Sequence, residues 1–272
     1  MRGKEPANYR DDPNYLQTAG RTLKILQLFL DGENLSLTTI AKRMNLSSTV
    51  TYRLLYTLTV HGFLLQDEDK TYRVGPAMVA VGLKGVQAHK ARAVASRYMW
   101  DFFRQSGYTV TMTACLDMRS VVVERFRSIQ DQNDTLYVGR SYPLHAGASH
   151  RILLAFMDED KREEYLAGLF MDENTKTGLR RELERIRRRG YDYTEQATTK
   201  DIWGMSVPLF DSHGTCTAGL STGGYLSEMT PEVFRERLRL LRQLGRQINE
   251  ALGAPESCGE CPPLDDEHFP EK

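Results

Sequence analysis

The chain has 272 residues with 36 basic and 36 acidic side chains, so its formal net charge is zero. This balance argues against a protein that coats nucleic acid without sequence preference. Hydrophobic residues make up 40% of the chain, and the length favours two domains that each bury a core. There is no apolar run of membrane-spanning length, and residues 1–15 are too polar for a signal peptide, so we expect a cytoplasmic protein with no membrane partner.

The N-terminal region predicts a disordered lead-in followed by one helix. Residues 1–15 are rich in Pro, Asn, Asp and Arg, a composition that does not bury a core. An apolar stripe at helical spacing then runs to Asp31 and Gly32, where glycine can take the left-handed conformation that ends a helix. The stripe consists of Ala19, Thr22, Leu23, Leu26, Phe29 and Leu30.

Residues 36–66 contain three basic residues and no acidic one, in a pattern that predicts a helix-turn-helix. Apolar residues at helical spacing predict a first helix that ends in a short turn at Asn45. A second helix follows, and Ser47 or Ser48 is expected to cap it by accepting a backbone N–H of its first turn.

The second helix has two predicted faces. At 100° per residue, one face packs and the opposite face is polar. The packing face is predicted to hold Ser47, Val50, Leu54, Leu58 and His61, and the polar face Thr49, Tyr52 and Tyr56 with Ser48 and Arg53 at its flanks. Hydroxyls, tyrosines and an arginine suit the major groove of DNA, because they reach phosphates and base edges without placing a carboxylate there. An ordinary amphipathic hairpin with a solvated face is the alternative for this segment.

A strand, a polar turn and a second strand follow over residues 63–75, and a hairpin in this place is a wing. Residues 16–75 are therefore predicted to be a winged helix-turn-helix domain that binds double-stranded operator DNA. We expect Thr49 and Tyr52 to read base edges and Lys42 and Arg53 to hold phosphates. The full set of predicted DNA-binding residues is Thr38, Lys42, Arg43, Ser47, Ser48, Thr49, Tyr52, Arg53, Tyr56, Lys70 and Arg73.

Residues 76–90 predict a linker helix, and residues 91–253 predict a second domain. The linker is more apolar than a solvated connector, which indicates burial against a partner subunit. In the second domain, hairpins over residues 108–126 and 205–222 enclose and precede helices, a pattern typical of an α+β fold around an antiparallel sheet. A pocket on a curved sheet is the expected ligand site.

The four cysteines give little support for metal binding. Cys115 and Cys216 lie in predicted strands and are expected to be small buried hydrophobic residues. Cys258 and Cys261 have the spacing of half a zinc site, but no second pair at comparable spacing completes it. They lie in residues 254–272, which we predict to be a disordered tail, so we expect no metal and no cofactor.

Several short motifs in order resemble the IclR-type bacterial transcriptional regulators, from about residue 16 to residue 252. They are the runs at 47–55, 62–64, 72–75, 143–146, 153–155, 189–191 and 207–211. The resemblance implies a winged-helix domain, a linker helix that dimerises, and a GAF-like effector-binding domain that often assembles dimers into tetramers. It also implies a small-molecule effector, commonly an organic or aromatic carboxylate, and a regulator that acts as a repressor or an activator.

A helix predicted from Ala148 gives an anion site in the second domain. The backbone N–H groups of Gly147, Ala148 and Ser149 are expected to crowd its N-terminus, which suits a carboxylate. By family position, residues 195–201 and 221–223 face the same cavity. The predicted effector-binding residues are Gly147, Ala148, Ser149, Glu195, Asp201, Cys216, Ser221 and Gly223. Capping by Ser149 and an ordinary strand role for Ser221 are the alternatives.

The sequence departs from the family at His150 and Arg151, where a Gly-Lys pair is usual, so we expect a reshaped pocket. The competing function is a hydrolase that uses Ser149 and His145. No nucleophile elbow, phosphate-binding glycine loop or His-Glu-x-x-His pair supports it, so no catalytic residue is predicted.

Overall fold

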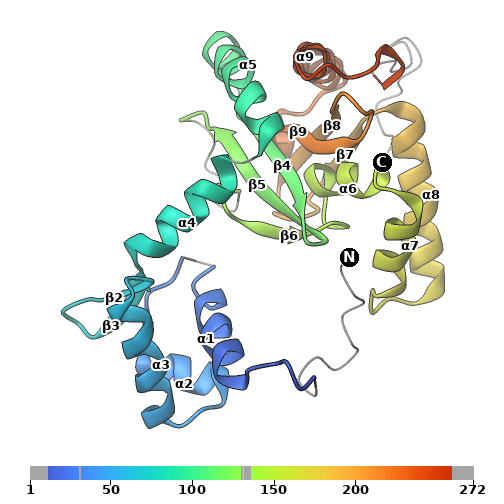
Figure 1. The fold of residues 1–272 in the computed structure, drawn as a ribbon. Helices are drawn as coiled ribbons and strands as arrows, with labels where there is room; N and C mark the ends of the chain where they lie inside the picture. Colours follow the sequence, from blue (N-terminus) through green and yellow to red (C-terminus); the bar gives the residue numbers. More distant parts are fainter. Residues whose placement is uncertain (1–11, 31, 88, 130, 132–135, 259–272) are drawn as a thin grey trace. The chain divides into compact units, whose positions relative to one another are not determined.

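The computed structural model describes residues 12–30, 32–87, 89–129, 131 and 136–258. The chain divides into two compact units, one up to residue 88 and one from His89 onward. Each unit has its own sheet and its own buried core. The fold class is the predicted one, an N-terminal winged helix-turn-helix and a C-terminal α+β unit on an antiparallel sheet (Figure 1).

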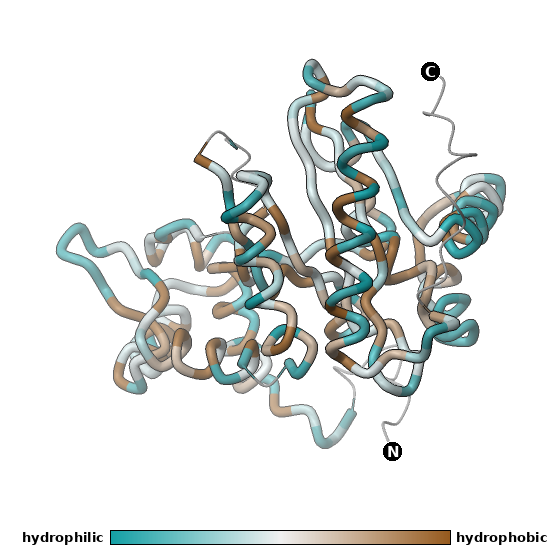
Figure 2. The backbone as a smooth tube through the Cα atoms, turned by 90° about the horizontal axis from the view of Figure 1, so that it is seen from above, coloured by the Kyte–Doolittle hydropathy of each residue, from teal (hydrophilic) through white to brown (hydrophobic). Residues whose placement is uncertain are grey.

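The N-terminal unit is a helical core closed by a three-stranded antiparallel sheet of order β1-β3-β2. Its elements are α1 (Gln17–Gln27), β1 (Leu35–Ser36), α2 (Leu37–Met44), α3 (Ser48–Val60), β2 (Leu64–Gln66), β3 (Thr71–Val74) and α4 (Pro76–Gln87). β2 and β3 form the predicted wing, whose hydrophilic turn lies at the left edge of Figure 2. A Cβ at Gly75 would collide with the carbonyl oxygen of Gly62, so the close approach at the base of the wing requires glycine.

The turn between α2 and α3 has the expected chemistry. Asn45 takes a left-handed conformation with φ 53°, which ends α2. The Ser47 hydroxyl oxygen accepts the Val50 N–H at 3.3 Å and caps α3. Ser36 caps α2 in the same way through the Thr39 N–H at 3.2 Å. The predicted helix-turn-helix is confirmed, and Ser47 rather than Ser48 is the cap.

The packing face of α3 differs from the prediction. Its buried residues are Thr51, Leu54, Leu55 and Leu58, whereas Val50 is 37% exposed and His61 is exposed. The buried side is shifted because α1, α2 and β2 contact the helix along the line of Thr51 and Leu55. The predicted stripe of the first helix is wrong at Ala19, Leu23 and Leu30, which are exposed. Phe29 is buried as predicted, and Ile25, which was not predicted, is fully buried.

The C-terminal unit is built on a six-stranded antiparallel sheet of order β6-β5-β4-β9-β8-β7. Its strands are β4 (Val110–Leu116), β5 (Arg119–Phe126), β6 (Ser141–Pro143), β7 (Asp192–Glu195), β8 (Ile202–Phe210) and β9 (Cys216–Tyr225). Its helices are α5 (Lys90–Ser106), α6 (Ala148–Ala155), α7 (Glu159–Ala167), α8 (Glu173–Arg189) and α9 (Pro231–Ala251), with 3-10 turns η2 (Leu226–Glu228) and η3 (Glu256–Cys258). The helices divide between the two faces of the sheet, α5 and α9 on one and α6, α7 and α8 on the other (Figure 1).

Three features of this unit were not predicted. The edge strands β6 and β7 were missed, because they are too short to show a period of two. α8 begins at Glu173, ahead of its first buried apolar residues Leu183 and Ile186, because Asp172 caps it by accepting the Thr175 N–H at 2.9 Å. At the C-terminal side, η3 occupies the first part of the predicted disordered tail, while residues 259–272 and most of the lead-in, residues 1–11, lie outside the described residues.

A buried carboxylate joins α6, β7 and α8. Asp192 is fully buried, and both its oxygens accept from the Arg151 guanidinium at 2.8 Å. Arg189 from the end of α8 donates to the same carboxylate at 2.9 Å. This bidentate contact gives Arg151, one of the two departures from the family pattern, a structural role in holding α6 against the sheet edge.

We predict that Asp192→Asn lowers the free energy of unfolding by about 2–3 kcal/mol, because it leaves two partly buried guanidinium groups without their carboxylate. Urea titration of the purified variant measures the loss. The matched control is Asp101→Asn, which breaks an exposed pair with Arg104 at 3.6 Å and is expected to cost less than about 0.5 kcal/mol. Equal losses in the two variants contradict the structural role of Asp192.

Candidate functional site

The N-terminal unit presents one polar helix face to solvent. Thr49, Tyr52, Arg53 and Tyr56 of α3 are all exposed, as predicted, and the two tyrosine rings lie 6.2 Å apart along the helix. No acidic residue interrupts residues 36–66. The face therefore offers hydroxyls, aromatic edges and a cation without a carboxylate to repel phosphate.

The basic residues of this unit differ in how they are engaged. In the described part of the chain, the side chains of Lys42 and Arg53 are exposed and have no hydrogen-bond or ion-pair partner. Arg43 is paired with Glu33 at 3.0 Å, and Arg73 of the wing with Asp67 at 2.7 Å. These two cations must exchange a carboxylate for a phosphate before they can hold DNA, so Lys42 and Arg53 are better placed for that role.

The remaining predicted positions of the unit lie around the helix starts and the wing tip. Thr38 is exposed and shares a hydrogen bond with Ser36 at 2.9 Å. Ser47 and Ser48 are exposed at the N-terminus of α3, with the Ser47 hydroxyl engaged as the cap. Lys70 is exposed at the wing turn with φ 65°. The structure thus brings the predicted set onto α2, α3 and the wing of one small unit.

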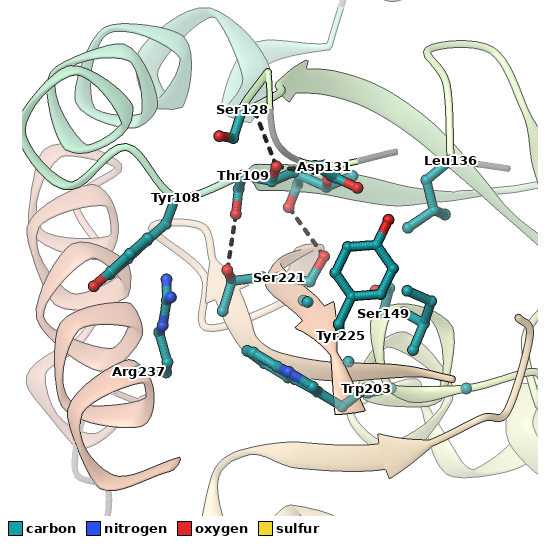
Figure 3. Close-up of a pocket in the computed structure, with 18 of the residues that line it drawn as sticks. Tyr108, Thr109, Ser128, Asp131, Leu136, Ser149, Trp203, Ser221, Tyr225 and Arg237 are labelled. Carbon is teal, nitrogen blue, oxygen red and sulfur yellow. Dashed lines mark hydrogen bonds between the residues drawn. The ribbon is translucent and has the colours of Figure 1, made fainter. Parts of the chain in front are cut away.

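The C-terminal unit contains a cavity of about 740 Å³. Gly147, Ala148 and Ser149 from the start of α6 line it, together with Ser221 and Gly223 of β9. Its lining also includes aromatic and charged side chains from β8, α9 and the segment before β4, as Figure 3 shows for Trp203, Arg237 and Tyr108. A concave site of this size with a few convergent polar groups is typical of a small-molecule pocket.

The N-terminus of α6 points unpaired donors into this cavity. The Ala148 N–H donates to the Thr194 hydroxyl at 3.1 Å. Within the described residues, the N–H groups of Gly147 and Ser149 have no acceptor, and Gly147 at the cap position offers no side chain. Gly147 has φ 88°, and a Cβ there would lie 3.2 Å from Thr198, so glycine is required for this conformation and for the open N-terminus.

Hydroxyl groups on the adjoining strands hold the cavity wall together. The Ser221 hydroxyl donates to the carbonyl of Thr111 at 3.2 Å, and the Thr222 hydroxyl to that of Thr109 at 2.8 Å (Figure 3). These bonds tie β9 to β4 at the cavity. The Ser221 hydroxyl proton is therefore used structurally, and its oxygen is left to accept from a ligand.

Three predicted effector residues lie outside the cavity lining. Glu195 accepts the Tyr193 hydroxyl at 2.9 Å, and Asp201 lies in the turn before β8 with φ 60°. Cys216 packs in a separate apolar cluster with Leu144, and burial raises the pKa of its thiol to about 12. β7 and β8 pair with each other and place Glu195 and Asp201 at the end of the hairpin, which is why these two side chains do not reach the lining.

Sequence reasoning missed Trp203, Tyr108, Arg125 and Arg237, which also line the cavity. They come from four separate parts of the fold, and only its tertiary packing brings them together. No local spacing marks them as a set. Arg237 in particular reads as one more charged residue of an amphipathic helix.

The hydrolase alternative lacks the contact it needs. Nδ1 of His145 is hydrogen-bonded to the Tyr165 hydroxyl at 2.8 Å, and among the described residues no hydrogen bond joins His145 to Ser149. No three His, Cys, Asp or Glu side chains of the described residues are grouped so that they could hold a metal ion. Cys258 is a described residue, whereas Cys261 lies outside the described part of the chain. In the same part of the chain, no helix is both long and apolar enough to cross a bilayer.

Two family models match the chain. One, described as the IclR helix-turn-helix domain, covers residues 18–68, and the other, described as bacterial transcriptional regulator IclR C-terminal, covers residues 83–250. The second alone spans more than half of the sequence. The chain belongs to the IclR family. It is therefore a transcriptional regulator with a helix-turn-helix unit and an effector-binding C-terminal unit.

Relatives of known name support the assignment. The chain is 28% identical to the HTH-type transcriptional regulator XynR of Escherichia coli (strain K12), over 88% of this chain and 98% of the relative. It is 22% identical to the transcriptional repressor IclR of the same organism, over 93% and 96%. The enzyme alternative finds no support among these names.

Solved IclR structures share the fold. The crystal structure of the Thermotoga maritima IclR matches with a TM-score of 0.67 at 26% identity, over 88% of this chain and 100% of that one. An IclR homolog from Microbacterium hydrocarbonoxydans, crystallised with 4-hydroxybenzoate, matches with a TM-score of 0.73 at 22% identity, over 86% and 98%.

His150, the second departure from the family pattern, is buried beside the cavity. Its Nδ1 is hydrogen-bonded to the Ser120 hydroxyl at 2.8 Å, and its ring stacks on Tyr142 at 4.5 Å between centroids. Burial lowers the pKa of His150 from 6.5 to about 3, so the ring is neutral in the folded protein near neutral pH. It therefore brings no positive charge to the cavity.

This burial predicts a pH dependence of stability. As pH falls below 6.5, the unfolded chain takes up a proton at His150 that the folded protein refuses until about pH 3, so stability is lost on acidification across that window. Between about pH 7 and about pH 5, we expect the free energy of unfolding to fall by about 2 kcal/mol less in His150→Gln than in the parent protein. Urea unfolding of both proteins at the two pH values measures the difference. An equal fall in the free energy of unfolding for the two proteins contradicts a neutral buried His150.

Proposed function

We propose that this IclR-family member is a dimeric regulator that binds operator DNA through α3 and responds to a small organic acid held in the cavity of its C-terminal unit. The observation that carries the proposal is the pairing of two surfaces in one chain. One is an acid-free polar helix face, and the other is a cavity with unpaired backbone donors at a helix N-terminus. In this proposal the regulator acts as a repressor or an activator and works in the cytoplasm.

The proposed DNA contacts follow from exposure and charge. Thr49 and Tyr52 read base edges in the major groove, since they lie on the exposed face of α3 near its N-terminus. Lys42 and Arg53 hold phosphates, because both are exposed cations without a carboxylate partner among the described residues. Arg43, Arg73 and Lys70 add contacts at the flank and the wing.

The linker helix supports a dimer. No residue of α4 is buried within its own unit, and Val79, Val81 and Leu83 are 50%, 64% and 55% exposed. A helix of this apolar character is stabilised when a second copy covers it. A two-fold dimer then requires a palindrome-like operator with half-sites one helical turn apart, or a multiple of it. Tetramers form from such dimers through the C-terminal units in this proposal.

The effector proposal rests on the chemistry of the cavity. The Gly147 and Ser149 N–H groups offer a seat for one carboxylate, and Trp203 supplies an aromatic wall for the body of the ligand. The homolog from Microbacterium hydrocarbonoxydans was crystallised with 4-hydroxybenzoate, a small aromatic acid. An organic acid of about this size fits the pattern of donors in the present chain.

Selection of genomic DNA fragments by the purified full-length protein tests the proposal. The experiment is run at about 0.15 M salt, near physiological ionic strength, and the retained fragments are sequenced. Enrichment of a palindromic site supports operator binding by a dimer. Retention without any enriched sequence, or no retention at all, contradicts the proposed function.

Substitutions on the operator found in this way separate the two kinds of contact. Lys42→Ala and Arg53→Ala are expected to weaken binding to all sequences alike and to lower the salt slope by about one unit each, because each removes one phosphate contact. Tyr52→Ala is expected to relax base preference at one position at a cost of about 1–3 kcal/mol. Fluorescence anisotropy with operator and mutated operator fragments measures both effects.

The matched control is Arg239→Ala, which removes an exposed cation from α9 of the other unit and is expected to leave operator affinity unchanged. If Lys42→Ala changes only base preference, or if Tyr52→Ala and Arg53→Ala leave specific binding intact, α3 is not the reading element.

A further inference from the structure

Two arginines from different elements reach the effector cavity, and they differ in their partners. Arg125 of β5 is paired with Asp131 at 2.7 Å. The same carboxylate accepts the Thr109 hydroxyl at 2.7 Å. The charge of Arg125 is therefore already balanced by a carboxylate of the cavity wall. A ligand anion gains less binding energy at Arg125 than at a cation without such a partner.

Arg237 of α9 is the contrasting case. Its guanidinium carbon lies over the Tyr108 ring, 2.9 Å from the ring centre, so the cation is in contact with an aromatic face. Its Nε is buried without an acceptor, and no described residue forms a hydrogen bond or an ion pair with the guanidinium. Burial lowers the pKa of Arg237, against the opposing effects of Tyr108, Glu236 and Glu228.

The two nearby acids do not neutralise this cation by contact. Glu228 and Glu236 are exposed to water, and neither comes within ion-pair distance of Arg237. A partly desolvated guanidinium without a bound anion is costly, and a carboxylate that arrives with a ligand removes that cost while forming two parallel hydrogen bonds. Arg237 is thus preorganised to receive an acid.

The positions of these groups define a cavity with two polar ends. In Figure 3, Arg237 and Tyr108 lie at one side, Ser149 at the start of α6 lies at the other, and Trp203 and Ser221 lie between them. Trp203 is only 2% exposed, and Gly224 packs close to its indole, since a Cβ at 224 would lie 3.2 Å from the ring. The indole thus forms part of the cavity wall between the two polar ends, and the middle of the cavity suits an apolar or planar spacer.

We propose that Arg237 is a second acid-binding subsite of this cavity and that the effector carries two acidic groups. One acid binds at the N–H groups of Gly147 and Ser149, and the other binds the guanidinium of Arg237 across the indole of Trp203. The inference rests on the proposed function, since it assigns the ligand class of the same effector site. His150 is neutral and lies beside the first acid. The cation that binds the second acid, and so favours a two-acid ligand over a mono-acid, is therefore supplied by α9.

Isothermal titration calorimetry of the full-length protein with matched acids tests the subsite. The probes are the linear dicarboxylates from succinate to suberate and terephthalate. Each is compared with the mono-acid of the same carbon skeleton, from butyrate to octanoate for the linear acids and 4-methylbenzoate for terephthalate. At least one two-acid probe is expected to bind about tenfold or more tightly than its mono-acid, because a charge-assisted bidentate contact is gained. Arg237→Gln is expected to abolish that preference, and Arg237→Lys to restore only part of it.

The matched control is Arg235→Gln, two residues away on α9, whose side chain is exposed and paired with Glu232 at 3.2 Å. It is expected to keep the two-acid preference. Unchanged melting temperatures without ligand show that each variant is folded. If mono-acids bind as tightly as two-acid probes, or if Arg237→Gln keeps the preference, the second subsite is wrong while the anionic effector stands. If no acid of either series binds, the anionic effector is itself wrong, and the subsite with it.

Discussion

The approach of α6 to the sheet determines where the cavity lies and what it can bind. The Thr113 hydroxyl of β4 donates to the Ser149 carbonyl at 2.6 Å, and a Cβ at Gly219 of β9 would lie only 2.6 Å from Ile152. Glycine on the strand thus lets the helix pack directly on the sheet. With α6 held there, and tied to the sheet edge through Arg151 and Asp192, its N-terminal donors are fixed in the cavity wall.

The two units obey different physical constraints. In the N-terminal unit, a small core of apolar residues orients α3 so that its polar side stays in water. No acidic residue lies on α2 or α3, so no carboxylate repels the phosphates of DNA there. In the C-terminal unit, the sheet sets the positions of groups that are far apart in sequence. Zero net charge overall is therefore compatible with a DNA-binding unit whose helix pair is basic and a separate effector-binding unit.

Much of the N-terminal unit could be read from the sequence, because its signals are local. Helix caps such as Ser47, the left-handed Asn45 and the polar face of α3 depend on neighbours within a few residues. The buried side of α3 was predicted to include Val50, whereas the structure buries the adjacent line of Thr51 and Leu55. Packing partners decide between two such neighbouring faces, and periodicity alone does not. In the cavity, Gly147 and Ser149 were found from a helix start, whereas Arg237 and Trp203 were invisible because only strand pairing and helix docking bring them to the site.

The central claim is that the cavity and the DNA-reading helix belong to one switch, so a ligand with different affinities for two states of the protein must change operator affinity. The most direct test is the dissociation constant for an operator fragment, measured by anisotropy without and with a saturating acid ligand. The account predicts a change of about fivefold to about 150-fold in either direction, with the same factor appearing in ligand affinity when operator is bound. An operator affinity that is unchanged at full ligand occupancy contradicts it.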